Sequence, residues 1–297
     1  MTSIPSTIIQ YIKDNAPYPS ALIGCRAGSG QQPFGCCEYD VAVFSENRKA
    51  NPDTVITLNN AAIEFIHFPT HIHDGHCVYL KDMVILKDHD NFFLSSTLAK
   101  IKEKKQDRLL KIYGKRQIVE SLFLYELINK NLSKYPLLSS FWLKISAYHL
   151  TNGILAIHGI KSSPAHELEQ IRTLDLKSAE TAWGMHIALD CIGIERAGTS
   201  AISRSLKVFS AINRSKARST IWPDKLRWML QQGRVADSYY YLGKIAAEYI
   251  LSKDEGFVGR FLKPVGILLD LSNDPQSIHK LHNLLVKASK DALKSSV

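Results

Sequence analysis

Two acidic residues, Glu38 and Asp40, stand one residue apart in a short, apolar stretch of the chain, residues 38–44. The composition and length of this stretch predict a buried strand. Side chains alternate between the two faces of a strand, so Glu38 and Asp40 are expected to point the same way. Two neighbouring carboxylates repel each other unless they face water or a cation lies between them. The cation that suits an oxygen-only pair is a hard divalent metal, most often magnesium.

A glycine-rich loop precedes this acidic stretch and follows another apolar run. The run Ala21-Leu22-Ile23 ends at Gly24, and Gly24-Cys25-Arg26-Ala27-Gly28 opens the loop. This order of strand, Gly-rich loop and acid–hydrophobic–acid resembles the signature of the polymerase-β-like nucleotidyltransferase superfamily. Cys25 and Glu38 depart from that signature, which usually has Ser and Asp at these places, and the loop is longer than is common. Either half of the pattern alone is unspecific, but both together favour the resemblance.

The resemblance implies an activity and its site residues. The expected reaction is metal-dependent transfer of a nucleoside monophosphate from a nucleoside triphosphate, such as ATP, to a hydroxyl acceptor, with release of pyrophosphate. Glu38 and Asp40 would bind Mg²⁺ or Mn²⁺. The superfamily has a third carboxylate on a later strand, and Glu64, in the predicted strand 61–68, matches it by order and context. Glu64 would complete a metal shell or take the acceptor's proton; the alternative is an edge-strand residue that faces solvent.

The Gly-rich loop is the expected phosphate-binding segment. Gly24, with Cys25 or Ser29, would bring backbone N–H groups near the β- and γ-phosphates. A second register of the motif uses Gly28-Ser29 as its Gly-Ser pair. A cysteine donates a weaker hydrogen bond than a serine does, which weakens the assignment of Cys25. Arg26 would neutralise phosphate charge, or else hold the loop in a structural role.

A second group of metal-binding residue types follows in the segment His67–Cys77. It contains four histidines, one Asp and one Cys in eleven residues. Imidazole is a good ligand for zinc and other transition metals, but the spacing matches no strong zinc pattern. We therefore expect a solvated loop or hairpin here, with a metal site or a histidine contact to the nucleotide as the alternatives.

These residues must be positioned by a small α/β domain, which we place at residues 1–95. The pattern predicts a first helix that ends near Asn15. It then predicts strands over 21–23, 38–44, 54–58 and 61–68, and one more over Val78–Leu86.

From residue 96 the pattern changes to helix, and we assign residues 96–297 to a helical domain. Apolar residues recur at helical spacing over 96–133 and then over 137–160, 164–174, 177–196, 199–213, 222–231, 234–252 and 276–294. The expected fold class is therefore α+β, with a small mixed-sheet nucleotidyltransferase domain followed by an all-α helical bundle. Kanamycin-type aminoglycoside nucleotidyltransferases share this layout, which is an analogy of architecture only.

Charged residues are distributed unevenly along the chain, and this distribution helps to predict the class of acceptor. Residues 1–100 contain seven Lys/Arg and ten Asp/Glu. Residues 101–297 contain thirty Lys/Arg and eighteen Asp/Glu, which gives this part a net charge of +12. Such a basic half favours RNA or another polyanionic acceptor over polycationic aminoglycosides, unless it is merely a solvated surface. Arg214, Lys216 and Arg218 are the predicted phosphate contacts. Trp222, Trp228 and Tyr239–Tyr241 either stack on bases or belong to the core.

The remaining alternatives concern function and compartment. A degenerate domain of this kind would act as a non-catalytic nucleotide-binding regulator or as an antitoxin-like module. The chain has five cysteines and no C-x-x-C pair, which favours a reducing cytoplasm over a disulfide framework. The N-terminus lacks a basic flank followed by an apolar core, and no apolar run is long enough to span a bilayer. We therefore expect a cytoplasmic protein with no secretory signal and no membrane partner.

Overall fold

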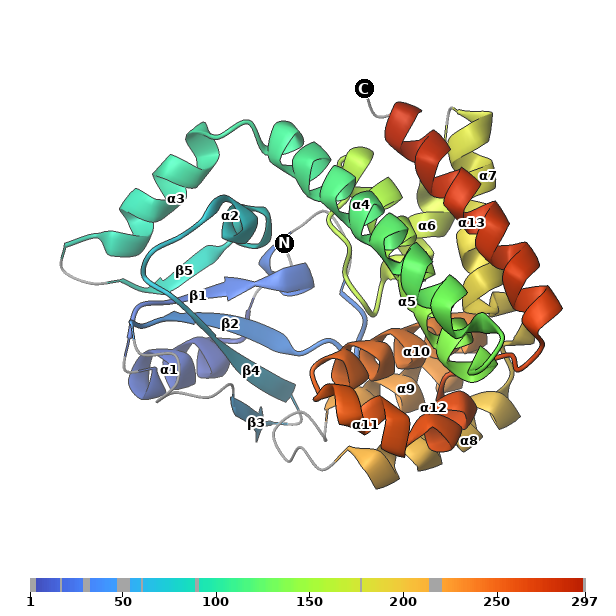
Figure 1. Cartoon of the computed structure of the whole chain (residues 1–297). Helices are drawn as coiled ribbons and strands as arrows, with labels where there is room; N and C mark the ends of the chain where they lie inside the picture. Colours follow the sequence, from blue (N-terminus) through green and yellow to red (C-terminus); the bar gives the residue numbers. More distant parts are fainter. Residues whose placement is uncertain are drawn as a thin grey trace. The chain divides into compact units, whose positions relative to one another are not determined.

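The structure is a computed structural model that describes residues 4–16, 18–28, 33–46, 54–59, 61–88, 91–176, 178–213 and 221–295 (Figure 1). The chain divides into two compact units. Unit 1 comprises Met1–Leu109 and Ser215–Trp228, and unit 2 comprises Leu110–Arg214 and Met229–Val297. A mixed sheet with helices comes first in the chain and a largely helical region follows, so the predicted α+β class is confirmed. The domain boundary after residue 95 stays a prediction.

Unit 1 contains a five-stranded sheet with the strand order β3-β4-β2-β1-β5. The strands are β1 (Ser20–Ile23), β2 (Tyr39–Phe44), β3 (Thr54–Leu58), β4 (Ala61–Phe68) and β5 (Val84–Lys87). β2 and β4 run parallel, and the other neighbouring pairs are antiparallel. The first four strands agree closely with the sequence prediction. They are rich in β-branched and aromatic residues, which suit a buried pleated surface.

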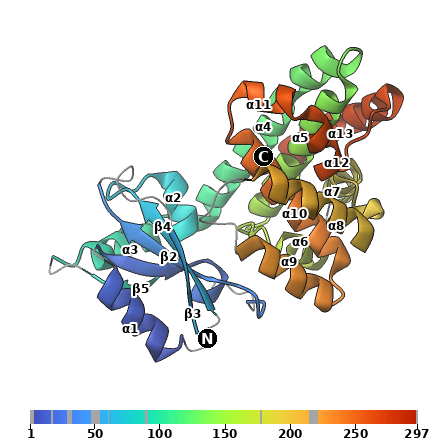
Figure 2. The same cartoon turned by 90° about the horizontal axis from the view of Figure 1, so that it is seen from below.

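Helices cover both faces of this sheet. α1 (Ser6–Asn15) packs Ile8 and Ile12 against the face that bears Val41 and Val43 of β2. The other face, which bears Ala42, meets α2 (Asp74–Leu80) and α3 (Phe93–Glu103) (Figure 2). Even-numbered residues of β2 therefore lie on the α2–α3 side, because side chains alternate along a strand.

The strand predicted over Val78–Leu86 is wrong in its first half. Residues 74–80 form α2, and the strand β5 begins only at Val84. Cys77, Val78 and Leu80 are buried, and Cys77 and Leu80 pack in the same core cluster as β1 and β2. The apolar residues that resembled a strand are thus the buried side of a short helix. At its first turn the backbone N–H of His73 donates to Nδ1 of His76 at 3.3 Å, which satisfies one of the backbone donors at the start of the helix.

The helical region begins with α4 (Gln106–Leu132), and the single run predicted over 96–133 is in fact α3 and α4. The helices that follow are α5 (Pro136–Ile157), α6 (Glu167–Thr173), α7 (Ala179–Ile192), α8 (Thr199–Ile212), α9 (Ile221–Gln231), α10 (Val235–Leu251), α11 (Glu255–Arg260), α12 (Leu262–Leu268) and α13 (Pro275–Ser295). Short 3₁₀ turns occur at Gly24–Ala27 and Ile194–Arg196. The helices α11 and α12 were not predicted. In the ranges that the structure describes, no helix combines the length and hydropathy that crossing a bilayer requires.

α4 and α5 pack closely within unit 2 because two glycines face each other. A Cβ added at Gly114 would lie 2.7 Å from the backbone oxygen of Gly153. Any side chain at Gly114 would therefore push the two helices apart. Most of α5 is buried, as expected of a helix that is apolar all round.

Candidate functional site

Three carboxylates come together on the α2–α3 side of the sheet in unit 1. Asp40 of β2 lies directly opposite Glu64 of β4 in the parallel register, and Glu38 immediately precedes β2. One carboxylate oxygen from each of the three residues lies within 4.8 Å of the other two. The side chains are largely buried, with Glu38 9% and Glu64 6% exposed. The structure therefore brings together all three acidic residues that the sequence singled out.

The three acids share an excess of negative charge. Burial raises the pKa of Asp40 well above its usual value, and the neighbouring Glu38 and Glu64 carboxylates raise it further, while Lys225 opposes them. A divalent cation would offset this charge. The donor set, made only of carboxylate oxygens, fits Mg²⁺ or Mn²⁺ and not the nitrogen and sulfur ligands typical of zinc.

Gly24 allows the backbone of the preceding loop to approach the acids. Ile23 of β1 pairs with Asp40, so Gly24 leaves the sheet beside this carboxylate. A Cβ at Gly24 would collide with Asp40 Oδ2, and the residue has a φ of +74°, a conformation that side chains disfavour. Both the space and the backbone conformation at this position therefore require glycine.

The residues after Gly24 have different surroundings. The Sγ atoms of Cys25 and Cys37 lie within 4.8 Å of each other. The hydrogen bond to Cys37, followed by burial, raises the pKa of the Cys25 thiol, so Cys25 stays protonated and is a poor nucleophile. Arg26 donates through Nε to the backbone oxygen of Cys37 at 2.8 Å, and its guanidinium lies 4.4 Å from the centre of the Tyr39 ring.

These contacts give Arg26 a structural role in holding Gly24–Ala27 against the start of β2. The phosphate-binding roles of Gly24, Cys25 and Arg26 stay predictions. Ser29, the alternative member of the Gly-Ser pair, lies outside the described residues.

The sequence prediction missed one residue at this site, Lys225 of α9. Its ammonium group lies 2.7 and 2.5 Å from the two carboxylate oxygens of Glu38. Lys225 is itself buried, with 7% of its surface exposed. No local sequence signal marks it, because a lysine in a helix is ordinarily a solvated residue. Only the fold brings it beside an acid 187 positions earlier in the chain.

The histidine-rich segment is only partly the predicted loop, because α2 begins within it at Asp74. The rings of His71 and His73 lie 4.8 Å apart between centroids, and those of His73 and His76 lie 5.8 Å apart. Within the described ranges, these imidazoles do not bring three ligand atoms together as the three carboxylates do. The histidine side chains instead pack on one another at the start of α2.

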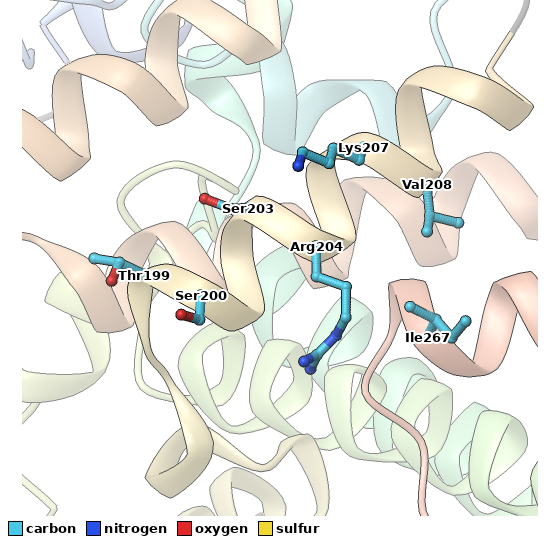
Figure 3. Close-up of a pocket in the computed structure, with 7 residues that line it drawn as sticks. All are labelled: Thr199, Ser200, Ser203, Arg204, Lys207, Val208 and Ile267. Atoms are coloured by element: carbon cyan, nitrogen blue, oxygen red, sulfur yellow. The ribbon is translucent and has the colours of Figure 1, made fainter.

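Unit 2 contains a separate open hollow of about 570 Å³ along α8 (Figure 3). Its polar lining comes from successive turns of this helix, and Ile267 of α12 faces Val208 across it. The lining residues on α8 are Thr199, Ser200, Ser203, Arg204, Lys207 and Val208. Three hydroxyl groups and two cationic side chains on one helix suit phosphate oxygens. The predicted phosphate contacts Arg214, Lys216 and Arg218 lie outside the described residues.

The aromatic residues proposed as base-stacking candidates are mostly core residues. Trp222 and Tyr239–Tyr241 are buried. Trp228 stacks on Phe34 with ring centroids 5.3 Å apart. The structure thus supports the core alternative for this group.

Comparison with solved structures finds several similar chains. The chain matches the crystal structure of a nucleotidyltransferase-like protein from Exiguobacterium sibiricum over 89% of its own length and 88% of that chain, at 11% sequence identity and a TM-score of 0.35. No protein family model and no curated protein matches the chain.

Proposed function

We propose that unit 1 is a nucleotidyltransferase domain, which binds a nucleoside triphosphate with Mg²⁺ or Mn²⁺ and transfers the nucleoside monophosphate to a hydroxyl acceptor. The observation that carries this proposal is the convergence of Glu38, Asp40 and Glu64, whose oxygens lie within 4.8 Å of one another. Three largely buried acids so close together repel one another, and the single positive charge of Lys225 offsets their charge in part. Displacement at a phosphoryl group is the chemistry that a carboxylate-held divalent ion commonly supports.

Each residue of the site has its own role in the proposed reaction. Glu38 and Asp40 hold the cation, which when bound supplies Lewis-acid stabilisation of the charge on the phosphoryl oxygens. Glu64, opposite Asp40, accepts the proton of the acceptor hydroxyl as the new bond to the α-phosphorus forms and pyrophosphate leaves. Gly24, which has no side chain, leaves the space beside Asp40 open. The backbone N–H groups after it bind the β- and γ-phosphates.

The acceptor that we propose is RNA or another polyanion. Residues 101–297 carry a net charge of +12, which attracts polyanions and repels polycations such as aminoglycosides. The hollow along α8 supports this choice, since Arg204 and Lys207 line it together with three hydroxyl groups. Small hydroxyl compounds with phosphate groups belong to the same class of acceptor.

The proposal is tested by ATP binding, measured with and without Mg²⁺ by calorimetry. Wild-type protein is expected to bind ATP more tightly with Mg²⁺, and Asp40→Asn is expected to lose this difference. The matched control is Asp14→Asn, since Asp14 is exposed on α1 and accepts a hydrogen bond from Gln10 of the same helix. Equal Mg²⁺-dependent affinity in wild type and Asp40→Asn would remove the metal assignment.

A second candidate is a non-catalytic nucleotide-binding regulator. The observation that favours it is the ion pair between Lys225 and Glu38, because one of the three acids already has a cationic partner. Transfer of label from α-labelled triphosphates to RNA or small hydroxyl compounds separates the two functions. Tight binding of nucleotide without any transfer would favour the regulator.

A further inference from the structure

The ion pair of Lys225 and Glu38 places a fixed positive charge inside the acidic site of unit 1. Both oxygens of Glu38 lie within 2.7 Å of the Lys225 ammonium group, and each side chain is at most 10% exposed. A buried charge is stable only when it is paired, so each residue depends on the other. Glu38 is at the same time one of the three acids whose oxygens converge.

A second contact fixes the position of this lysine. Trp228, one helical turn after Lys225, stacks on Phe34, four positions before Glu38. A Cβ at Gly35 would lie 3.1 Å from the Trp228 indole nitrogen, so glycine at this position permits the close approach. The same side of α9 thus contacts the segment before β2 twice, and residues 221–228 belong to unit 1 together with the sheet.

When all three acids are ionised, the charges at the site do not balance without a further cation. Glu38, Asp40 and Glu64 carry three negative charges when ionised, and Lys225 supplies one positive charge. A divalent ion would neutralise the remaining two. It would also compete with Lys225 for Glu38, since two cations on one carboxylate repel each other. A nucleoside triphosphate changes this balance because it adds several negative charges beside the acids.

We propose that Lys225 is an internal competitor of the metal at Glu38: its ammonium group holds Glu38 in the nucleotide-free protein and moves to the triphosphate oxygens when a metal–nucleotide complex binds. This inference rests on the proposed metal–nucleotide site. It makes metal binding dependent on nucleotide. A free metal ion must compete with Lys225 for Glu38. A metal ion that arrives with a triphosphate also brings phosphate oxygens, which are a new anionic partner for the displaced Lys225.

The test uses Lys225→Met in the full chain, with two separate titrations. In the first, Mn²⁺ alone is titrated and followed by its electron paramagnetic resonance signal. We expect Lys225→Met to bind Mn²⁺ about tenfold or more tightly than wild type, because the competing charge is gone. In the second, ATP is titrated at saturating Mg²⁺, and we expect Lys225→Met to bind it about tenfold or more weakly, because a phosphate partner is lost.

Lys100→Met, at an exposed position of α3 in the same unit, is the matched control and is expected to change neither affinity. Lys225→Arg keeps the charge and should keep the weak binding of free Mn²⁺. If Lys225→Met does not fold, as judged by circular dichroism, Lys225→Gln replaces it in the same two titrations.

The outcomes separate this inference from the proposed function. If Lys225→Met binds free Mn²⁺ as wild type does, while wild type binds ATP in a Mg²⁺-dependent way, then Lys225 does not compete with the metal. The proposed nucleotidyltransferase function is unaffected by that result. Unchanged ATP affinity in the variant overturns the transfer of Lys225 to the triphosphate. Tighter Mn²⁺ binding in the variant supports the competition even when no nucleotide binds. Absence of both Mn²⁺ and ATP binding in every variant overturns both proposals.

Discussion

Asp40 and Glu64 lie directly opposite each other on the adjacent parallel strands β2 and β4. Since side chains alternate along both strands, this register puts the two carboxylates on the same face of the sheet. A shift of one residue in the pairing would send Glu64 to the face that α1 covers. The pairing of two strands, rather than any local motif, therefore decides whether Glu64 belongs to the site.

Replacement of Glu64 by Gln tests its role as the proton acceptor. The change keeps the shape of the side chain and removes its charge. We expect Glu64→Gln to bind Mg²⁺–ATP but to transfer the nucleotide about 100- to 10,000-fold more slowly, the usual loss with a general base. Transfer of α-label to RNA measures the rate. The control is Glu103→Gln at the exposed end of α3. A Glu64→Gln variant that transfers the nucleotide as fast as wild type would show that Glu64 is not the proton acceptor.

Replacement of Gly24 by Ala tests the close approach of the loop to the acids. The new Cβ would displace the Asp40 carboxylate, and the φ of +74° adds strain of about 1 kcal/mol or more. We expect loss of Mg²⁺-dependent ATP binding together with lower stability in urea.

Gly159→Ala, in unit 2, is the matched control for this change. Gly159 has a φ of +81°, but a Cβ there meets no atom within 4 Å. This variant should therefore lose stability while the acidic site stays intact. Equal nucleotide binding by Gly24→Ala and wild type would show that the contact with Asp40 does not matter.

Reversal of charge at Lys207 tests the hollow on α8 as a phosphate-binding surface. Each phosphate that a cationic side chain neutralises releases counterions, so RNA affinity falls as salt rises. We expect Lys207→Glu to weaken RNA binding and to reduce the slope of its salt dependence by about one. Lys290→Glu, the same change at an exposed position of α13, is the control. Equal effects of the two variants would mean that only net charge matters.

The buried lysine of α5, Lys144, predicts how stability depends on pH. Burial, followed by the nearby Arg196, lowers its pKa to about 7, while Asp270 and Glu195 oppose the shift. Its amino group donates to the backbone oxygen of Leu269 at 2.6 Å. The lysine pKa is about 10.4 in the unfolded chain, so the unfolded state binds more protons between these two values.

The free energy of unfolding should therefore rise with pH from about 7 to about 10, by at most about 1.4 kcal/mol per unit from this group. Below pH 7 both states are protonated, and the unfavourable burial is present in full. Lys144→Met should remove this contribution, which urea unfolding at several pH values measures. An identical pH slope in wild type and variant would contradict the assignment.

Much of unit 1 was predictable because its strands have strong local patterns. The apolar runs that end at Ile23, Phe44 and Phe68 mark β1, β2 and β4 whatever their partners are. The residues of α2 were misread, because a short apolar run of this kind fits a strand as well as one side of a helix. The break between α3 and α4 was also missed, since no glycine or proline marks it.

The sequence by itself determined the chemistry that is available: paired acids at strand spacing, a glycine where the chain leaves β1, and a basic second half. These features depend on residue type and on spacing within one element, so they are visible without a fold. Only the tertiary structure decided that Glu64 lies opposite Asp40 and that Lys225 pairs with Glu38. Both relationships join residues that are far apart in the chain. They arise from the register of the strands and from the packing of helices, which no local sequence pattern reveals.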